Sequence, residues 1–363
     1  MAAPVKVERY TRTSRIALPV AAVIVIAAAT VPAWGSSALM KQSVTFLTLV
    51  ALAQMWNLLA GYAGLVSVGQ QAYVGIGAYT LWVFAEKFGV NPFLCVPIAG
   101  LVAAAFSVPT AGLAFRLRGG YFAVGTWVIA EVYRLLITQI SWLGGGSGVS
   151  INSAGKIERA TREAVVYWWA LGVAIGAIVL VYLLLRSRRG LALTAIRDDE
   201  TGARGLGVNV FRSKLWVYII AAFGTGMTGA VIYLNLLRAQ PEAAFSLQWS
   251  ALMIFAVVIG GLGTIEGPIV GAVIFFALQQ FLAGYGTWYL ILIGVLAAGV
   301  VVFAQRGLWG SIVRRWPIDL FPVRRRLCLE TVCFLEESPR QSAEEPGRLT
   351  AGGLAPPEEP PAD

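Results

Sequence analysis

The sequence contains no histidine, and only 13% of its 363 residues are charged. The absence of histidine excludes histidine-based acid–base catalysis, nucleophile activation and metal ligation. Cysteine is scarce as well, with three in the chain. Cys95 lies in an apolar run and is interpreted as a packing residue, whereas Cys328 and Cys333 lie in a polar tail without a partner pair. Neither a disulfide nor a metal site is expected.

Apolar residues take the place of the missing charge. Hydrophobic residues make up 58% of the chain and the mean hydropathy is +0.72, whereas soluble domains carry ~45–50% apolar and ~25% charged residues. This composition predicts an all-α polytopic membrane protein. The net charge of +9 would suggest nucleic acid as the partner of a soluble protein. Here the basic residues cluster at the ends of apolar runs, so they are interpreted as orientation signals and lipid contacts, and no nucleic-acid partner is expected.

About ten membrane-spanning helices are expected, because one span needs ~20 apolar residues. The expected spans cover 16–34, two within 42–85, 88–115, 119–140, 164–185, 215–237, 243–265 and two within 267–305. One re-entrant segment would lower the total to about eight or nine. The first run follows a basic segment, as in a signal peptide, but its length and the later spans favour a retained helix.

The distribution of Lys and Arg predicts the orientation. If the basic N-terminus is cytoplasmic, an even number of spans returns the most basic segments to the same side, as the positive-inside rule requires. The expected regions are a cytoplasmic N-terminus over 1–15, a transmembrane domain over 16–305 with a cytoplasmic loop over 186–214, and a cytoplasmic tail over 306–363. The Pro, Gly and Glu content of the tail predicts that it is largely disordered.

The stretch GLVSVGQQAYVGIGAY is apolar enough for a bilayer but forms a poor helix. Each glycine weakens a helix by roughly 0.8–1 kcal/mol relative to alanine, and a broken helix in lipid must face protein or a wet cavity. A translocation path and close packing by small residues both explain such a break. The candidate path residues are Gly64, Gly69, Gln70, Gln71, Tyr73, Gly75 and Gly77.

A second break is predicted in VIGGLGTIEGPIVGA, over Val258–Ala272. Paired interruptions in the two halves of a transporter point to the solute site. Gly261, Gly263, Glu266 and Pro268 are therefore added to the candidate path. Glu266 is expected near the cytoplasmic face, either as a loop carboxylate or in gating or docking.

Glu131 and Arg134 are charges within an expected span, and their spacing puts them on one helix face. A charge at mid-bilayer costs at least a few kcal/mol, so a pair buried against protein is expected. Two interpretations remain open: a self-neutralised pair that locks two helices together, or part of the translocation path.

The expected cytoplasmic loop contains RSRRGLALTAIRDDETGARGLGVNVFRSKL. Ala192–Leu206 has the composition of a short helix that is ended by glycines. Its charges of both signs are compatible with a solvated helix and with a docking helix, because recognition at an interface rim uses complementary charge. The candidate docking residues are Arg197, Asp198, Asp199, Glu200, Arg204, Gly205, Leu206 and Gly207.

The residues favour a transporter driven by separate ATPase subunits. The chain has no G-x-x-x-x-G-K-[ST] sequence, so it cannot itself cradle ATP phosphates. The rival, an ion-coupled secondary carrier of a small polar solute, commonly needs an unpaired acid within the membrane, whereas the expected spans contain no Asp and Glu131 has Arg134 beside it. A membrane enzyme is disfavoured because histidine and acidic clusters are absent. No catalytic residue, cofactor or metal is assigned to this chain.

Four segments together resemble the permease subunits of ABC importers for branched-chain amino acids, in particular the M-type permease of the leucine/isoleucine/valine system. They are GYAGLVSVGQQAYVGIGAYT, LRGGYFAVGTWVIAEVYRLL, RGLALTAIRDDETGARGLGVNVFRSKL and VVIGGLGTIEGPIVGAVI, within about 44–315. The resemblance implies a second homologous permease, two cytoplasmic ATPase subunits that bind ATP-Mg, an external substrate-binding protein, and the inner membrane of a prokaryote.

The resemblance also implies that 196–208 contains the helix that couples to an ATPase subunit. Glu200 and Gly207 match the family's loop, whereas Thr201, Gly202 and Arg204 replace residues that are usually small or acidic. Gly202 is expected to weaken the helix by ~1 kcal/mol. Because relatives also carry urea, amides and other amino acids, the solute stays open.

Overall fold

The computed structural model describes residues 6–8, 12–282, 291, 294–295, 298–299, 307–315, 320–321, 326–329 and 332–333. The chain divides into two compact units, residues 1–9 with 324–363, and residues 10–323. In the first unit, an antiparallel sheet has the order β1 (Lys6–Glu8), β4 (Arg326–Leu329), β5 (Val332–Cys333). Most of the tail for which disorder is predicted lies outside the described residues.

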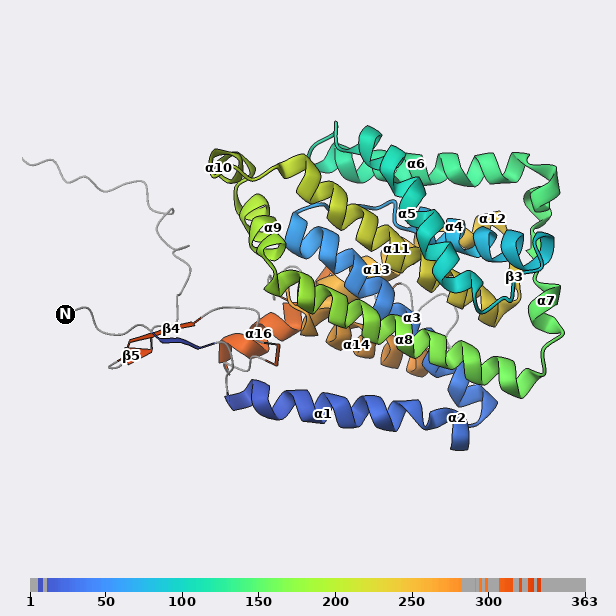
Figure 1. Ribbon diagram of the computed structural model, residues 1–363, viewed down its shortest axis with the longest axis horizontal. Helices are drawn as coiled ribbons and strands as arrows, with labels where there is room; N and C mark the ends of the chain where they lie inside the picture. The colour runs from blue at the N-terminus through green and yellow to red at the C-terminus, as the bar shows by residue number, and fades with distance from the viewer. Residues whose placement is uncertain are drawn as a thin grey trace, which may run out of the picture. The chain divides into compact units, whose positions relative to one another are not determined.

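The second unit is built of helices (Figure 1). In chain order they are α1 (Arg12–Ala29), α2 (Val31–Trp34), α3 (Ser37–Asn57), α4 (Gln71–Trp82), α5 (Cys95–Ala114), α6 (Gly120–Gln139), α7 (Asn152–Gly155), α8 (Arg159–Arg186), α9 (Arg188–Asp198), α10 (Glu200–Gly205), α11 (Val210–Leu236), α12 (Pro241–Ala244), α13 (Leu247–Gly260), α14 (Glu266–Leu282) and α16 (Gly307–Arg315). π-Helical turns extend α3 over Leu58–Tyr62 and α4 over Val83–Lys87. The short strands β2 (Val149–Ser150) and β3 (Arg238–Ala239) pair with each other.

Six helical segments in the described part of the chain are long and apolar enough to cross a membrane. They are Ser37–Tyr62, Cys95–Ala114, Gly120–Gln139, Arg159–Arg186, Val210–Leu236 and Pro241–Gly260. Two shorter apolar helices, Pro19–Trp34 and Glu266–Phe281, coincide with further expected spans. The predicted class, an all-α polytopic membrane protein, is therefore confirmed. Most of the second expected span within 267–305 lies outside the described residues.

The core lies around α4, whose residues are all buried. α11 packs against α3, α4 and α5, and small residues allow the backbones to approach closely. A β-carbon at Gly77 would overlap the carbonyl oxygen of Gly226 on α11 and lie 3.2 Å from the nitrogen of Ala230. By contrast, only 17% of an 18-residue apolar stretch of α6 is buried. α6 therefore lies at the surface of this unit.

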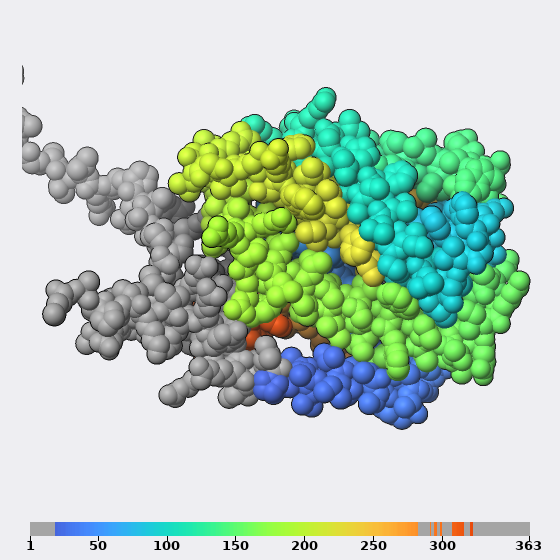
Figure 2. Space-filling model, in the orientation of Figure 1, coloured from blue at the N-terminus to red at the C-terminus, as the bar shows by residue number. Residues whose placement is uncertain are grey.

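Two ends of the unit are distinguished by their connections. Figure 1 shows α9 and α10 at one end, which we call the α9 end, and β3 and α7 at the other, the β2–β3 end. Along one edge, α1 contacts α8, and the Tyr167 hydroxyl of α8 donates a hydrogen bond to the carbonyl of Ala28 (2.6 Å). Figure 2 shows α1 lying against α8 in space-filling form. The exposed apolar side chains of α1 are compatible with contact to lipid.

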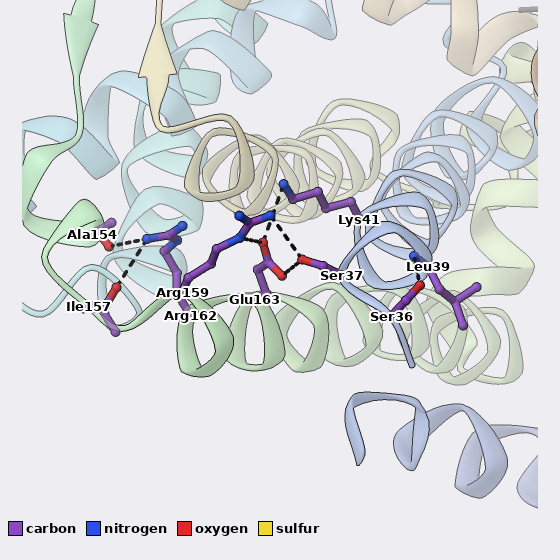
Figure 3. A network of polar contacts seen from close by, with 9 residues as sticks. All are labelled: Ser36, Ser37, Leu39, Lys41, Ala154, Ile157, Arg159, Arg162 and Glu163. Atoms are coloured by element: carbon purple, nitrogen blue, oxygen red, sulfur yellow. Dashed lines mark hydrogen bonds and ion pairs between the residues drawn. The ribbon is translucent and has the colours of Figure 1, made fainter. Parts of the chain in front are cut away.

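At the β2–β3 end, the first turns of α3 and α8 are joined through Glu163, whose side chain is 7% exposed. Figure 3 shows Ser37, Lys41 and Arg159 converging on its carboxylate. Arg159 Nε donates a hydrogen bond (2.9 Å), Ser37 Oγ donates a short one, and Lys41 Nζ forms an ion pair at 3.5 Å. Glu163 thus connects two helices through partners from both.

Replacing Glu163 with glutamine is expected to lower the thermal unfolding midpoint of the purified protein. Hydrogen bonds to charged groups contribute about 1.5–3 kcal/mol, and exposure of the Arg159 and Lys41 side chains reduces this, so a loss of about 1–2 kcal/mol is expected. Glu158→Gln is the matched control, since Glu158 directly precedes α8, is exposed and accepts a 3.3 Å hydrogen bond from the Thr161 hydroxyl. Equal midpoints for the two variants would contradict the role of Glu163.

Candidate translocation and coupling site

The first predicted break is present. After the π-helical turn that ends at Tyr62, residues 64–70 are non-helical until α4 begins at Gln71. The indole Nε1 of Trp56 donates a hydrogen bond to the carbonyl of Ser67 (2.7 Å), so this segment runs back beside the last turns of α3. Because it follows a continuous 26-residue helix, the break lies at the end of a span rather than midway along it.

The second predicted break is also present, between the end of α13 at Gly260 and the start of α14 at Glu266. Gly261 and Gly263 in this loop have φ values of 133° and 78°. Residues with a β-carbon rarely adopt such values, so glycine is needed for the chain to turn here.

Polar side chains near the end of α3, the helix that leads into the first break, bind the second break. Asn57 Oδ1 accepts a hydrogen bond from the Gly263 N–H (2.9 Å), and Asn57 Nδ2 donates one to the Thr264 carbonyl (2.8 Å). One turn earlier, Gln54 Nε2 donates a hydrogen bond to the Ile265 carbonyl (2.6 Å). Both amides are fully buried, and they satisfy backbone groups that the helix break leaves without helical partners.

Gly61 permits the close approach of the two segments, because a β-carbon there would lie 2.7 Å from the nitrogen of Gly263. We call this contact the break junction; it comprises Gln54, Asn57, Gly61, Gly263, Thr264 and Ile265. Both glycine-rich segments are predicted from the sequence, whereas their contact and the two amides that hold it are not. The signal available was a pair of amide side chains, Gln54 and Asn57, in an otherwise apolar run.

Arg197 attaches α9 to the break junction. Its Nη1 donates a hydrogen bond to the Gly61 carbonyl (3.0 Å), while Nε and Nη2 donate to Asp198 Oδ1 (3.1 and 3.0 Å). The same helix contacts the first break, since a β-carbon at Gly64 would lie 3.7 Å from the Arg197 Cα. The structure therefore brings two candidate path residues, Gly64 and Gly263, into one cluster with a candidate docking residue, Arg197.

The loop helix differs from the single helix expected over Ala192–Leu206. Two helices are present, and Asp199 separates them with an extended backbone (φ −152°, ψ 109°). Asp199 Oδ1 accepts a hydrogen bond from the Thr201 N–H (2.9 Å), which caps α10 and competes with continuation of α9. The interruption thus precedes Gly202, where weakening was expected.

Glu200 fastens α10 to α11. Its carboxylate accepts hydrogen bonds from Lys214 Nζ and Arg204 Nη2 (2.6 Å each). The hydrogen bond from Lys214 holds the pKa of the Glu200 carboxyl below its usual value, and Arg204 and Arg118 act in the same direction. Beyond α10, Leu206 is 82% exposed, and Gly207 has a φ of 80°.

The glycines predicted for the path lie inside the chain. A β-carbon at Gly69 would lie 2.6 Å from the carbonyl carbon of Thr126, and one at Gly75 would lie 2.5 Å from the Phe245 ring. With Gly77, these positions have the geometry of close helix packing. Their role in translocation stays a prediction.

The two adjacent glutamines also face the interior. Gln70 Oε1 accepts a 3.4 Å hydrogen bond from Thr225, and Gln71 Oε1 accepts a short one from Ser250. The fully buried Tyr73 ring lies edge-on to Tyr218, with centroids 5.9 Å apart. These side chains are therefore hydrogen-bonded or packed within the subunit and do not line its surface.

Glu266 and Pro268 both lie in the first turn of α14. Glu266 Oε1 accepts a hydrogen bond from the backbone N–H of Phe321 (3.1 Å). Pro268 is buried, and its missing N–H is tolerated because the first helical turn leaves its N–H groups without helical partners. Neither residue supplies a side-chain hydrogen bond to the break junction among the contacts described.

Glu131 and Arg134 form the predicted pair, with Arg134 Nε donating to Glu131 Oε1 (2.8 Å). The pair is not buried against another helix, because the two side chains are 43% and 24% exposed. It lines a cavity of about 330 Å³ between α6 and the start of α13. The cavity residues include Trp127, Glu131, Arg134, Glu242, Phe245 and Leu247.

Comparisons with known proteins agree with the resemblance. The family described as "Branched-chain amino acid transport system / permease component" matches residues 39–304. The high-affinity branched-chain amino acid transport system permease protein LivM of Escherichia coli is 28% identical over 280 residues, covering 69% of this chain and 65% of the relative. The chain thus spans just under two thirds of that relative's length.

Two more distant relatives show the range of the similarity. A probable branched-chain amino acid transport permease protein LivM of Methanocaldococcus jannaschii is 21% identical, covering 63% of this chain and 76% of the relative. A nucleoside ABC transporter permease protein NupC of Lactococcus lactis is 27% identical, covering 47% of this chain and 58% of the relative. With its apolar helices, the chain is a multi-pass inner-membrane protein. It belongs to the family of permease components of branched-chain amino acid transport systems.

Proposed function

We propose that the chain is a transmembrane permease subunit of an ATP-driven importer for branched-chain or related amino acids. It works with a second permease, two cytoplasmic ATPase subunits that bind ATP-Mg, and an external binding protein. The observation that carries the proposal is the hydrogen bond from Arg197 to Gly61. Through it, a loop suited to docking is joined to both breaks of the membrane domain.

The proposed topology has about ten spans, with both termini in the cytoplasm. The basic turn at 116–118 and the loop at 186–214 share one end of the unit, since Arg118 lies close enough to affect the Glu200 carboxyl. The positive-inside rule places this α9 end in the cytoplasm. The Leu206 side chain, 82% exposed there, is available to enter an apolar groove of an ATPase subunit.

The proposed mechanism is alternating access. Closure of the ATPase pair upon ATP moves α9 and α10, and Arg197 transmits this movement to the Gly61 carbonyl. The segments 64–70 and 261–265 absorb it, because non-helical backbone changes direction with less disruption than a helix. The solute passes along the α6 face, where Glu131 and Arg134 require water or protein rather than lipid.

Uptake by the reconstituted importer tests this function. The complex purified through a tag on this chain is placed in proteoliposomes with its binding protein, and uptake of radiolabelled leucine is measured. Uptake is expected to require ATP hydrolysis and to be unaffected by proton and sodium ionophores. Uptake driven by an ion gradient without ATP would contradict the proposal and indicate a secondary carrier. Competition by urea or amides, but not by amino acids, would overturn the proposed solute class.

A further inference from the structure

The Glu131–Arg134 side of α6 is a surface that lipid cannot cover favourably. Trp127, Glu131 and Arg134 follow one another at helical spacing on one side of the helix. A charged side chain at lipid-facing depth costs at least a few kcal/mol, yet both charged residues are partly exposed. This side of α6 therefore meets water or another protein, which is the condition for a solute-binding surface in a permease.

Two carboxylates, those of Glu131 and Glu242, line the cavity beside this pair, together with one cation, Arg134. Arg134 is already hydrogen-bonded to Glu131, and Glu242 lines the same cavity. Glu242 is exposed and forms no ion pair with any residue in the described part of the chain. An ammonium group in the cavity would therefore find an anion that the protein itself leaves unneutralised.

Apolar walls complete the cavity. Trp127 and Leu247 are 44% and 43% exposed, whereas Phe245 is 3% exposed. The Phe245 ring is held in place by α4, because it packs against Gly75 and lies 6.2 Å from the Tyr79 ring. The volume of about 330 Å³ is at the small end of the ~300–1,000 Å³ typical of ligand pockets.

We propose that this cavity is a transient binding site for a zwitterionic, apolar α-amino acid; the inference rests on the proposed function. The solute's carboxylate binds the guanidinium of Arg134, its ammonium binds Glu242 and Glu131, and its side chain lies against Trp127 and Leu247. Arg134 exchanges one carboxylate partner for another. Because binding replaces an existing ion pair, the site is weak, as release onward through the importer requires.

Equilibrium binding of radiolabelled leucine to the intact importer in lipid nanodiscs, without the binding protein, tests the site. Leucine is expected to bind weakly. The analogues that lack one charged group, 4-methylpentanoate and 3-methylbutylamine, are expected to compete at least tenfold less well than unlabelled leucine. Glu242→Gln is expected to weaken leucine binding at least tenfold, and Glu158→Gln, an exposed glutamate outside the cavity, to leave it unchanged.

Several outcomes would overturn the site: no leucine binding to the wild-type complex, equal binding by Glu242→Gln and wild type, or equal competition by the two analogues. Matching thermal unfolding midpoints show that the Glu242 variant is folded. ATP-dependent uptake by the wild-type importer is measured in parallel. If uptake requires ATP but the binding results fail, the cavity assignment alone is wrong; if ATP-dependent uptake is absent, the proposed function itself fails.

Discussion

Replacing Arg197 with alanine is expected to reduce ATP-driven uptake at least tenfold while the complex still assembles and hydrolyses ATP. The variant removes the hydrogen bond from α9 to the Gly61 carbonyl (3.0 Å) and leaves that carbonyl without its charged donor, a contact that contributes about 1.5–3 kcal/mol. Movement of the loop would then no longer reach the break junction. Uptake and ATP hydrolysis are measured together in proteoliposomes.

Arg188→Ala is the matched control, because Arg188 is exposed on the same helix and has no described contact with the junction. Arg197→Lys is expected to restore uptake in part, since an ammonium also donates hydrogen bonds but lacks the guanidinium fork. If Arg197→Ala transports as well as Arg188→Ala, the Arg197 contact does not transmit the movement.

Replacing Gly77 with alanine is expected to destabilise the folded protein strongly. The added β-carbon would overlap the Gly226 carbonyl oxygen and lie 3.2 Å from the Ala230 nitrogen. Both are backbone atoms, so α4 and α11 would have to separate, and overpacking of this kind costs about 1–3 kcal/mol or more. After the protein is heated, the fraction that remains monodisperse is measured by size-exclusion chromatography.

Gly112→Ala on α5 is the matched control, because a β-carbon there has no neighbouring atom within 4 Å. Alanine also favours a helix by ~1 kcal/mol over glycine, so the control is expected to be neutral or slightly stabilising. Equal stability of the two variants would show that the α4–α11 contact tolerates separation. The same reasoning predicts that Gly69→Leu impairs folding. Such a result would favour close packing over a path-lining role for Gly69.

Parts of the candidate site follow from local sequence. The Glu131–Arg134 pair could be predicted because residues three apart on a helix are neighbours. The break at 261–265 could be predicted from its glycines, which reach φ values that other residues rarely adopt. The split at Asp199 was missed, although an aspartate preceding a short polar helix is a capping signal.

The sequence by itself determined the membrane class, the two breaks and the basic loop, because hydropathy, glycine content and charge act over neighbouring residues. Only the tertiary structure decided that Asn57, at the end of α3 ahead of the first break, hydrogen-bonds to Gly263 in the second break, 206 residues away. Likewise it placed Glu242 and Arg134 in the wall of one cavity and brought Arg197 to Gly61. These contacts depend on how closely all the helices pack. The packing distance is set jointly by small residues at several helix crossings, so no local sequence pattern predicts it.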